Sequence, residues 1–280
     1  MAIILDGKDT SNKILEKIKE DVFALKTREV IPALHLILIG ADSGSLRYIG
    51  LKVKRAEEVG ISAVLHHFEK ITTAEVISLI EKLNVDPKTH GIMIQLPAPK
   101  DMNEAAIVEA ITPEKDVDGL SPVTFGKILM GEKAFLPAGV DAVMELLKRF
   151  NVEWEGKHWV VAGLTPWLGK PLVVHLLNKK VQVTGCPADD PNLPEMVKMA
   201  DILVIEVYRK NAVIASMVKK GVVIIDNGNN YEGKKVYGDV DTEGVTSVAS
   251  AITPVPGGTG PLLITMLLQN TVKAAQGYIL

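Results

Sequence analysis

Short apolar segments alternate with segments of helical periodicity along this chain, and the alternation limits the fold more than any other feature. The first pair is a continuous apolar run at residues 33–39, followed by a helical pattern that starts in the loop 41–45 and closes at Gly60. Apolar runs of this length are typical of strands buried on both faces of a parallel sheet. Strands and helices in turn at this spacing predict right-handed crossovers and an α/β fold.

The alternation runs through two cycles, which predicts two lobes. We expect strands at 33–39, 61–68, 91–95, 157–162, 181–184, 202–207 and 221–226, and helices at 9–27, 41–59, 73–83, 103–111, 140–150, 168–178, 193–200 and 262–275. The second cycle has the pattern of a dinucleotide-binding sheet. The predicted domains are residues 1–138 and 139–261, with a C-terminal helix, 262–280, that packs back on the first domain.

The composition is ordinary for a globular protein and argues against several classes of function. The 280 residues are 47% hydrophobic and 23% charged, enough for two cores. The net charge of −3 gives no general attraction for nucleic acid or an anionic membrane. No apolar run approaches the roughly 20 residues that span a bilayer. One cysteine and a poor signal-peptide pattern at the start of the chain favour a cytoplasmic protein.

Three polar residues lie at predicted strand ends or on the helix that follows the first strand. Tyr48 and Lys52 are four residues apart on a predicted helix, so both side chains project from one face. Gln95 ends a predicted strand, directly before a Leu-Pro pair. Ligands of parallel sheets bind beyond the carboxyl ends of the strands. A solvated lysine beside a half-buried tyrosine, and a glutamine that caps a turn, are the alternative interpretations.

Two further segments have a composition suited to ligand binding. Asp116 and Asp118 alternate, so their carboxylates lie on one side of an extended segment. A carboxylate accepts well from the paired N–H donors of an aminopyrimidine ring, and without a nearby histidine or third carboxylate we expect no metal site. Residues 253–261 contain three glycines and three prolines. This segment is either a stiff loop that approaches a flat ligand or an interdomain turn.

In this order and at this spacing, the motifs resemble those of the bifunctional methylenetetrahydrofolate dehydrogenase/methenyltetrahydrofolate cyclohydrolase family. They are Tyr48-x-x-x-Lys52, Gly91-x-x-x-Gln95-Leu96-Pro97, Lys115-Asp116-Val117-Asp118-Gly119, Pro254-Val255-Pro256-Gly257-Gly258, Gly156-Lys157, Gly169-Lys170-Pro171 and Gly238-Asp239-Val240-Asp241. The similarity covers nearly the whole chain. It implies a two-lobed α/β enzyme, with an N-terminal folate-binding catalytic domain and a C-terminal Rossmann-type NAD(P)-binding domain.

The resemblance implies two reactions on a one-carbon unit carried by tetrahydrofolate. A hydride passes from 5,10-methylenetetrahydrofolate to a nicotinamide, and water then adds to the methenyl cation to give 10-formyltetrahydrofolate. Lys52 would be the catalytic amine, Gln95 its hydrogen-bond partner, and Tyr48 a residue that positions the lysine or the substrate. Burial and a cationic substrate both lower the pKa of a lysine, so that a neutral Lys52 accepts a proton from water.

The same resemblance assigns the binding residues. Asp118 would hold the pterin N–H groups, and Pro256, Gly257 and Gly258 would line the folate pocket. The cofactor, NADP or NAD, would contact Gly163, Leu164, Thr165, Gly169, Lys170, Cys186, Asp189, Tyr208, Arg209 and Thr253. The resemblance also implies a homodimer through the second lobe.

The cofactor segment departs from the family's usual pattern at several positions. Leu164 stands where the family has an arginine suited to a 2′-phosphate, and Tyr208 stands where it has a glycine. Cys186 is followed by Pro-Ala instead of His-Ser, and then by Asp189 and Asp190, whose carboxylates would repel a phosphate and could bind ribose hydroxyls. We therefore expect a weakened preference for NADP, with Arg209 and Lys210 as an alternative source of phosphate contacts.

Three functions are compatible with these observations. The first is the bifunctional enzyme, and the second is a cyclohydrolase with impaired or lost dehydrogenase activity, which the departures at Leu164, Pro187-Ala188 and Tyr208 would explain. The third is a non-catalytic folate- or nucleotide-binding protein. The intact set of Tyr48, Lys52, Gln95 and Asp118 argues against the third.

Overall fold

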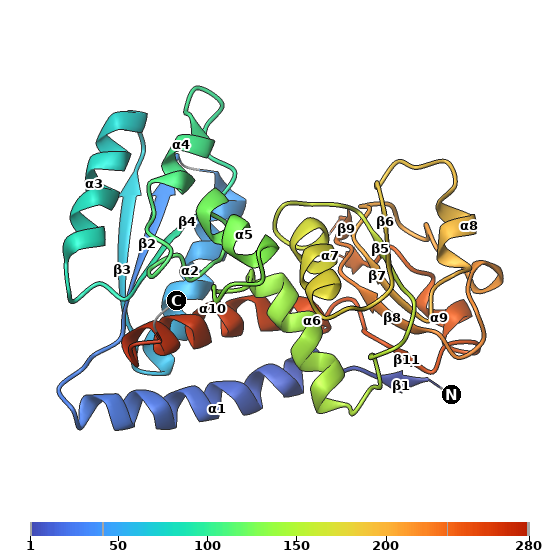
Figure 1. Cartoon of the computed structure of the whole chain (residues 1–280). Helices are drawn as coiled ribbons and strands as arrows, with labels where there is room; N and C mark the ends of the chain where they lie inside the picture. Colours follow the sequence, from blue (N-terminus) through green and yellow to red (C-terminus); the bar gives the residue numbers. More distant parts are fainter. Residues whose placement is uncertain (1, 41, 234, 279–280) are drawn as a thin grey trace. The chain divides into compact units, whose positions relative to one another are not determined.

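The computed structural model describes residues 2–40, 42–233 and 235–278, and the chain clusters into two compact units (Figure 1). The first unit comprises Lys13–Pro137 and Ile264–Leu280, and the second comprises Met1–Asn12 and Ala138–Leu263. Helices α1 (Gly7–Lys26) and α10 (Thr259–Ala275) contribute residues to both units. No helix among the described residues is long and apolar enough to cross a bilayer.

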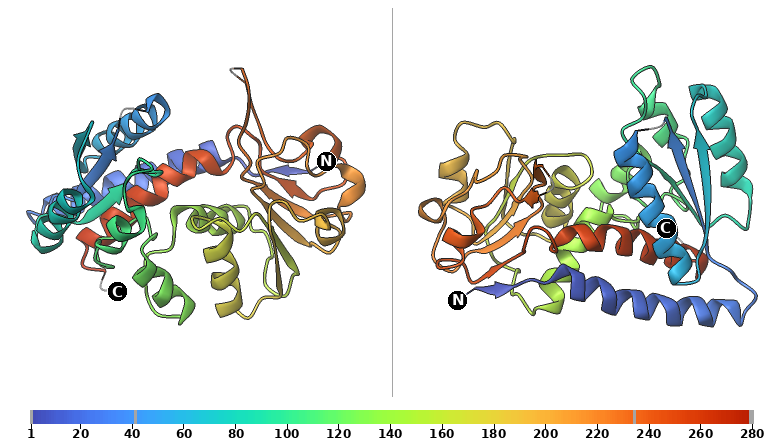
Figure 2. Two further views of the ribbon diagram at one scale, coloured as in Figure 1. Left: turned by 90° about the horizontal axis from the view of Figure 1, so that it is seen from above. Right: turned by 180° about the vertical axis from the view of Figure 1, so that it is seen from behind.

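The first unit is a three-stranded parallel sheet with helices on both faces. The sheet order is β3-β2-β4, from β2 (Ala33–Ile39), β3 (Ser62–Phe68) and β4 (Gly91–Ile94), and the helices are α2 (Ser43–Glu58), α3 (Thr73–Val85), α4 (Glu104–Glu109) and α5 (Pro122–Leu129). The apolar run of β2 is central, which explains why both of its faces are hydrophobic. Alternate residues Ile37 and Ile39 pack with Ile80 of α3 in one core cluster. Figure 2 shows these strands between their helices from two further directions.

The second unit is built on a six-stranded parallel sheet. Its order is β1-β11-β8-β7-β5-β6, from β1 (Ile3–Ile4), β5 (Trp159–Ala162), β6 (Val183–Cys186), β7 (Ile202–Ile205), β8 (Val223–Asp226) and β11 (Ala251–Ile252). Its other elements are α6 (Ala138–Arg149), α7 (Gly169–Asn178), α8 (Leu193–Val197), α9 (Thr242–Val245), the 3-10 helix Ala215–Met217 and the hairpin β9 (Asn230–Glu232)–β10 (Lys235–Tyr237). The chain order reverses at β5, which pairs with β6 on one side and β7 on the other. This reversal is the point where parallel sheets bind dinucleotides.

The α/β fold class with parallel sheets, predicted from the alternating pattern, is confirmed. The predicted domain boundaries at residues 138 and 261 stay a prediction. Residues up to Asn12 cluster with the second unit because β1 pairs with β11 over two residues, Ile3 with Ala251 and Ile4 with Ile252. A pairing this short leaves no periodic signal in a sequence.

Two histidines on neighbouring strands of the first unit form a stacked pair. Nδ1 of His35 on β2 lies 2.9 Å from Nε2 of His66 on β3, with ring centroids 5.2 Å apart. His35 Nε2 lies 3.3 Å from the Thr89 hydroxyl, which donates to Asp86. When both rings are neutral, every contact can be a hydrogen bond: His66 donates to His35, His35 donates to Thr89, and Thr89 donates to Asp86. Burial lowers the pKa of both histidines; for His35, His66 and Lys115 lower it further and Asp86 opposes.

We expect the first unit to lose stability as the pH falls below about 6.5, the ordinary pKa of histidine in an unfolded chain. The pKa of His35 and of His66 is lowered in the folded state, so the neutral pair contributes its full stabilisation above that pH. As the pH falls further, the histidines of the unfolded chain take up protons before those of the folded chain, and this favours unfolding. Hydrogen exchange of the β2 and β3 amides at pH 7.5 and pH 5 measures this locally. A local readout is needed because burial raises the pKa of Asp226 in the second unit to about 6.

The control for this effect is His66→Gln, whose amide N–H can still donate to His35 but does not titrate. The loss of protection between pH 7.5 and pH 5 should be smaller in this variant than in the unaltered chain. An equal loss would mean that the histidine pair does not carry the pH dependence.

Candidate active site

Lys52 is a buried lysine on the inward face of α2. This helix starts after Asp42, whose side chain accepts from the Ser45 amide, and buries Ile49, Lys52 and Ala56. Lys52 is 7% exposed, and its amine donates to Gln95 Oε1 at 3.0 Å. The same amine lies 5.3 Å from the centroid of the Tyr48 ring, within the range of a cation–π contact. The structure therefore brings the three predicted catalytic side chains together.

The amide of Gln95 is oriented by its own strand end. Its backbone N–H donates to Ile37 O at 2.8 Å, which extends the pairing of β4 with β2 by one residue. Its side-chain Nε2 donates to Leu96 O at 3.0 Å. Because the amide nitrogen has this partner, the amide oxygen faces Lys52 as an acceptor. The position that follows β4 thus fixes an acceptor for the lysine amine.

Lys52 and Asp118 interact electrostatically in a poorly solvated environment. Burial lowers the pKa of Lys52, and Asp118 opposes this. Burial raises the pKa of Asp118, with Lys52 opposing and Asp116 adding to the rise. Burial is the largest cause for both groups, so the direction is toward a neutral amine. A lysine of this kind is a better proton acceptor near neutral pH than a surface lysine.

The segment that carries Asp118 lies directly against β4. Ile92 N donates to Lys115 O at 2.8 Å, and Lys115 Nζ donates to two carbonyls at the end of α3. A Cβ atom at Gly91 would lie 2.8 Å from a methyl group of Val117, so only glycine permits this approach without displacement. Asn270 of α10 donates to Val117 O at 3.1 Å from the other direction. The position of Asp118 is therefore set by its neighbours in sequence.

Asp116 has a structural environment that distinguishes it from Asp118. It is buried, and its two oxygens accept from the backbone N–H groups of Leu120 and Ser121 at 3.2 and 2.8 Å. These bonds fold the chain into the start of α5. Among the described residues, no group of histidine, cysteine, aspartate and glutamate side chains is arranged to hold a metal ion.

The predicted loop at residues 253–261 lies in the second unit, packed against the first turn of α1. Lys8 N donates to Gly257 O at 3.1 Å, and a Cβ atom at Gly7 would lie 1.7 Å from Gly258 O. The hydroxyl of Thr253 is buried and accepts from Asp226 N at 2.8 Å. The loop is thus fixed by backbone contacts. The contacts of Pro256, Gly257 and Gly258 with a folate stay a prediction.

The turn from β5 to α7 is tight and has glycine at two crowded positions. Ideal Cβ atoms at Gly163 and Gly169 would each lie 1.9 Å from a backbone oxygen, of Glu206 and Gly163 respectively. Both positions therefore require glycine, and Gly163 has a φ of +92°. The N-cap of α7, Leu168, makes no side-chain hydrogen bond. A tight turn that ends at the start of a helix, beside the strand where the order reverses, matches a dinucleotide site.

The other predicted cofactor residues lie around the ends of β6 and β7. Cys186 is buried, its thiol donates to Pro187 O at 3.4 Å, and burial raises its pKa. Arg209 donates to Ala188 O at 3.1 Å and so connects the two strand ends. Tyr208 is exposed and has a φ of +55°. Leu164 and Thr165 lie in the turn, and Lys170 and Asp189 are exposed. Their contacts with a cofactor stay a prediction.

Glu206, Trp167 and Asn227 lie in this region and were not among the predicted site residues. Glu206 follows β7, is 4% exposed, and accepts from the Thr165 hydroxyl at 2.6 Å, from Trp167 Nε1 at 3.2 Å and from Asn227 Nδ2 at 2.5 Å. Burial raises its pKa, and these hydrogen bonds oppose the rise. We call Glu206, Thr165, Trp167 and Asn227 the Glu206 cluster. The available signal was a carboxylate inside the apolar run predicted as a strand at 202–207.

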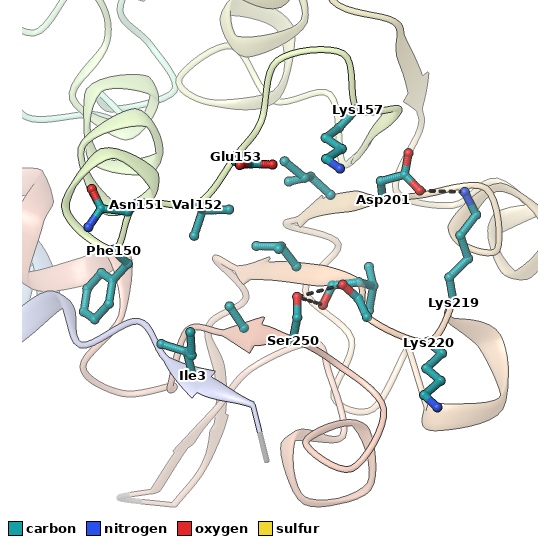
Figure 3. Close-up of a pocket in the computed structure, with 15 residues that line it drawn as sticks. Ile3, Phe150, Asn151, Val152, Glu153, Lys157, Asp201, Lys219, Lys220 and Ser250 are labelled. Atoms are coloured by element: carbon teal, nitrogen blue, oxygen red, sulfur yellow. Dashed lines mark hydrogen bonds and ion pairs between the residues drawn. The ribbon is translucent and has the colours of Figure 1, made fainter.

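A cavity of about 370 Å³ lies beside the amino ends of the strands in the second sheet, opposite to the ends that carry the predicted cofactor residues (Figure 3). Its lining includes Lys157 before β5 and the first residues of β7 and β8, Ile202 and Val223. Lys219 in this lining pairs with Asp201 at 2.9 Å. None of the predicted site residues lines this cavity. Ligands of parallel sheets bind at the carboxyl ends of strands, whereas this cavity adjoins the amino ends.

Family models match both parts of the chain. Residues 5–118 match the tetrahydrofolate dehydrogenase/cyclohydrolase catalytic domain, and residues 137–278 match the NAD(P)-binding domain of the same family. The bifunctional protein FolD of Bacillus subtilis is 46% identical over 277 residues, which cover 98% of each chain.

Solved structures agree with this assignment. The crystal structure of the bifunctional enzyme FolD, a methylenetetrahydrofolate dehydrogenase/cyclohydrolase from Campylobacter jejuni, has a TM-score of 0.96 and 39% identity, with 100% of both chains covered. The Trypanosoma brucei methylenetetrahydrofolate dehydrogenase-cyclohydrolase, complexed with NADP cofactor and inhibitor, has a TM-score of 0.93 and 30% identity, covering 99% of this chain and 98% of that one. By sequence and by fold, the chain belongs to the tetrahydrofolate dehydrogenase/cyclohydrolase family.

Proposed function

We infer that this chain is a bifunctional enzyme of one-carbon metabolism. It oxidises 5,10-methylenetetrahydrofolate to 5,10-methenyltetrahydrofolate with NAD(P), and it hydrolyses the methenyl form to 10-formyltetrahydrofolate. The observation that carries this function is the buried amine of Lys52, held 3.0 Å from Gln95 Oε1 beside the Tyr48 ring. An inert lysine would instead extend into solvent, as lysines on helix surfaces do.

In the proposed hydrolysis, Lys52 accepts a proton from the water that attacks the methenyl carbon. The bond from this carbon to N5 then breaks and N5 takes up a proton, which leaves the formyl group on N10. The substrate is cationic, so its binding lowers the pKa of the amine in the same direction as burial does. Oε1 of Gln95 accepts a hydrogen bond from the Lys52 amine and so holds the amine nitrogen in place. Tyr48 limits its movement from the ring side. Asp118 binds the N–H pair of the pterin, and its interaction with Lys52 links substrate binding to the state of the amine.

The oxidation depends on the second unit. When bound, NAD(P) supplies the acceptor for the hydride. The turn from Gly163 to Gly169 and the start of α7 would hold its phosphates. The carboxylates of Asp189 and Asp190 disfavour an additional 2′-phosphate. Lys210 does not offset them, because its amine pairs with Glu232 at 2.8 and 2.9 Å. We therefore propose a weakened preference for NADP over NAD.

Assays of both reactions with both nucleotides test this proposal. Formation of methenyl absorbance from the methylene substrate measures oxidation, and its loss measures hydrolysis. We expect both reactions, with kcat/KM values for NADP and NAD within about tenfold of each other, or about 1.4 kcal/mol. A several-hundredfold preference for NADP would contradict the role given to Asp189. Absence of hydrolysis would contradict the function as a whole, and hydrolysis without oxidation would leave a cyclohydrolase alone.

We further propose that the chain is a cytoplasmic homodimer that associates through the second lobe. The dimer follows from the resemblance of its motifs to the family, and the cytoplasmic location is supported by the single cysteine. Light scattering of the purified chain and fractionation of cells that produce it test them separately. A monomeric mass at micromolar concentration would contradict the dimer.

A further inference from the structure

The Glu206 cluster lies where the order of the second sheet reverses. Glu206 is the first residue after β7, and its N–H donates to Ala162 O at 2.8 Å, so it continues the pairing of β7 with β5. Its side chain is buried and accepts from Thr165 and Trp167 in the loop after β5 and from Asn227 in the loop after β8. Tyr208, in the same loop as Glu206, also hydrogen-bonds with this carboxylate. A buried carboxylate therefore lies at these strand ends.

The hydrogen bonds of the cluster connect the start of α7 to the start of α10. Gly169 N donates to Thr165 Oγ1 at 3.3 Å, and the Thr165 hydroxyl donates to Glu206 Oε2 at 2.6 Å. The other oxygen of Glu206 accepts from Asn227 Nδ2 at 2.5 Å, and Asn227 Oδ1 accepts from the Thr259 hydroxyl. The chain of bonds thus joins the three loops after β5, β8 and β11.

These bonds occupy the groups that a phosphate would use. A phosphate at a helix N-terminus is held by N–H and O–H donors of the preceding turn. Here the amide of Gly169 is directed to Thr165, and Thr165 and Trp167 are directed to Glu206. Glu206 also carries negative charge in its ionised form, which repels a second anion at short range in a poorly solvated crevice. The carboxylate thereby occupies the role that a bound phosphate would have in this turn.

We propose that Glu206 sets the affinity for the dinucleotide, because it competes with the phosphates for the donors of the 163–169 turn. This inference rests on the proposed function, because it concerns the cofactor of the oxidation. Dinucleotide binds only when Thr165 and Trp167 leave the carboxylate. Glu206 thus lowers the affinity for both NAD and NADP, and it keeps the turn ordered in their absence.

Calorimetric titration of NAD and NADP into the full chain tests this inference. Glu206→Ala should tighten the Kd of both nucleotides by about tenfold or more, since it frees two donors and removes the charge. Glu206→Gln removes the charge but leaves one amide oxygen for the turn, so a smaller gain is expected. Glu195→Ala is the matched control, because Glu195 is an exposed carboxylate of the same unit that pairs with Lys198. It should leave the Kd unchanged.

A second measurement follows the turn itself. The indole N–H of Trp167 donates to Glu206, so its nitrogen-15 NMR signal reports this contact. The signal is assigned with Trp167→Phe. Addition of NAD should shift it in the unaltered chain, whereas in Glu206→Ala it should already be shifted before NAD is added. A signal that does not move with NAD in the unaltered chain would overturn the proposal.

The titration has outcomes that separate the two proposals. An unchanged Kd in Glu206→Ala, or no binding by any variant, would overturn the role of Glu206, and a weaker Kd would make Glu206 a residue that contacts the ligand. If Glu206→Ala does not fold, Glu206→Gln decides the question. An unchanged Kd in Glu206→Gln would then overturn the role of Glu206. Hydrolysis of the methenyl substrate by the unaltered chain, measured without nucleotide, tests the proposed function independently.

Discussion

Replacing Lys52 by methionine is expected to slow hydrolysis of 5,10-methenyltetrahydrofolate by about 10² to 10⁴-fold, the usual contribution of a positioned acid or base. Methionine has a similar length and fills the same apolar space, but it cannot accept a proton. The amine that it removes is buried and bonded to Gln95, so no other group reaches the same point through that contact. Loss of methenyl absorbance at saturating substrate measures the change in kcat.

The matched control is Lys54→Met, two residues along the same helix. Lys54 is exposed, and its amine lies 4.0 Å from Glu58, so its removal should leave the rate within about twofold because exposed pairs contribute little. The rate of the unaltered enzyme should rise with pH through a pKa below the ordinary value of 10.5 for lysine, because the neutral amine is the active form. A Lys52→Met variant that keeps most of the rate would remove the lysine from the mechanism.

Replacing Asp239 by alanine is expected to destabilise the second unit by about 4 kcal/mol, since each buried donor left without a partner costs roughly 1–3 kcal/mol. Asp239 is fully buried. Its carboxylate accepts from the backbone N–H groups of Val207, Tyr208 and Arg209 and from Asn230 Nδ2, at 2.6 to 3.1 Å. Alanine would leave the three backbone donors without this acceptor, whereas Asn230 Nδ2 also donates to Gly238 O at 3.0 Å. Urea unfolding followed by circular dichroism measures the loss.

Asp241→Ala provides a graded comparison two residues further on. Asp241 caps α9 and accepts from Gly244 N at 3.4 Å, so its removal should cost about 1 kcal/mol, as for other N-caps. Equal losses in the two variants would contradict the structural role given to Asp239. The Asp239→Ala variant should also weaken dinucleotide binding, because the segment after Glu206 would lose its acceptor.

The sequence predicted the fold well where hydrophobic periodicity is local. The run at 33–39 was predicted as a buried strand of a parallel sheet and is its central strand β2. The carboxyl ends of neighbouring parallel strands share an edge, which is why Lys52 and Gln95 meet. One strand was predicted two residues early, at 181–184, whereas β6 is Val183–Cys186. Val181 is buried like a strand residue, but its N–H donates to Leu176 O and closes the end of α7.

The interactions that sequence could not predict are those that join distant loops. The Glu206 cluster depends on the spacing of three loops, and the contact of Asp239 with Val207 spans 32 residues. No periodic pattern encodes such distances. A charged residue within an apolar run does indicate an internal polar contact, although it does not identify the partner.

Gly91 has no side chain, yet it influences the electrostatic interaction between Lys52 and Asp118. The side chain of Val117, the residue before Asp118, packs against the backbone of β4 at a place where nothing projects from residue 91. Any larger residue would push the carboxylate segment outward and change its distance from the lysine. A search for inactive variants should therefore recover substitutions at residue 91 as well as substitutions of the reactive groups. The variants at residue 91 would keep every functional side chain but change the distance between Lys52 and Asp118.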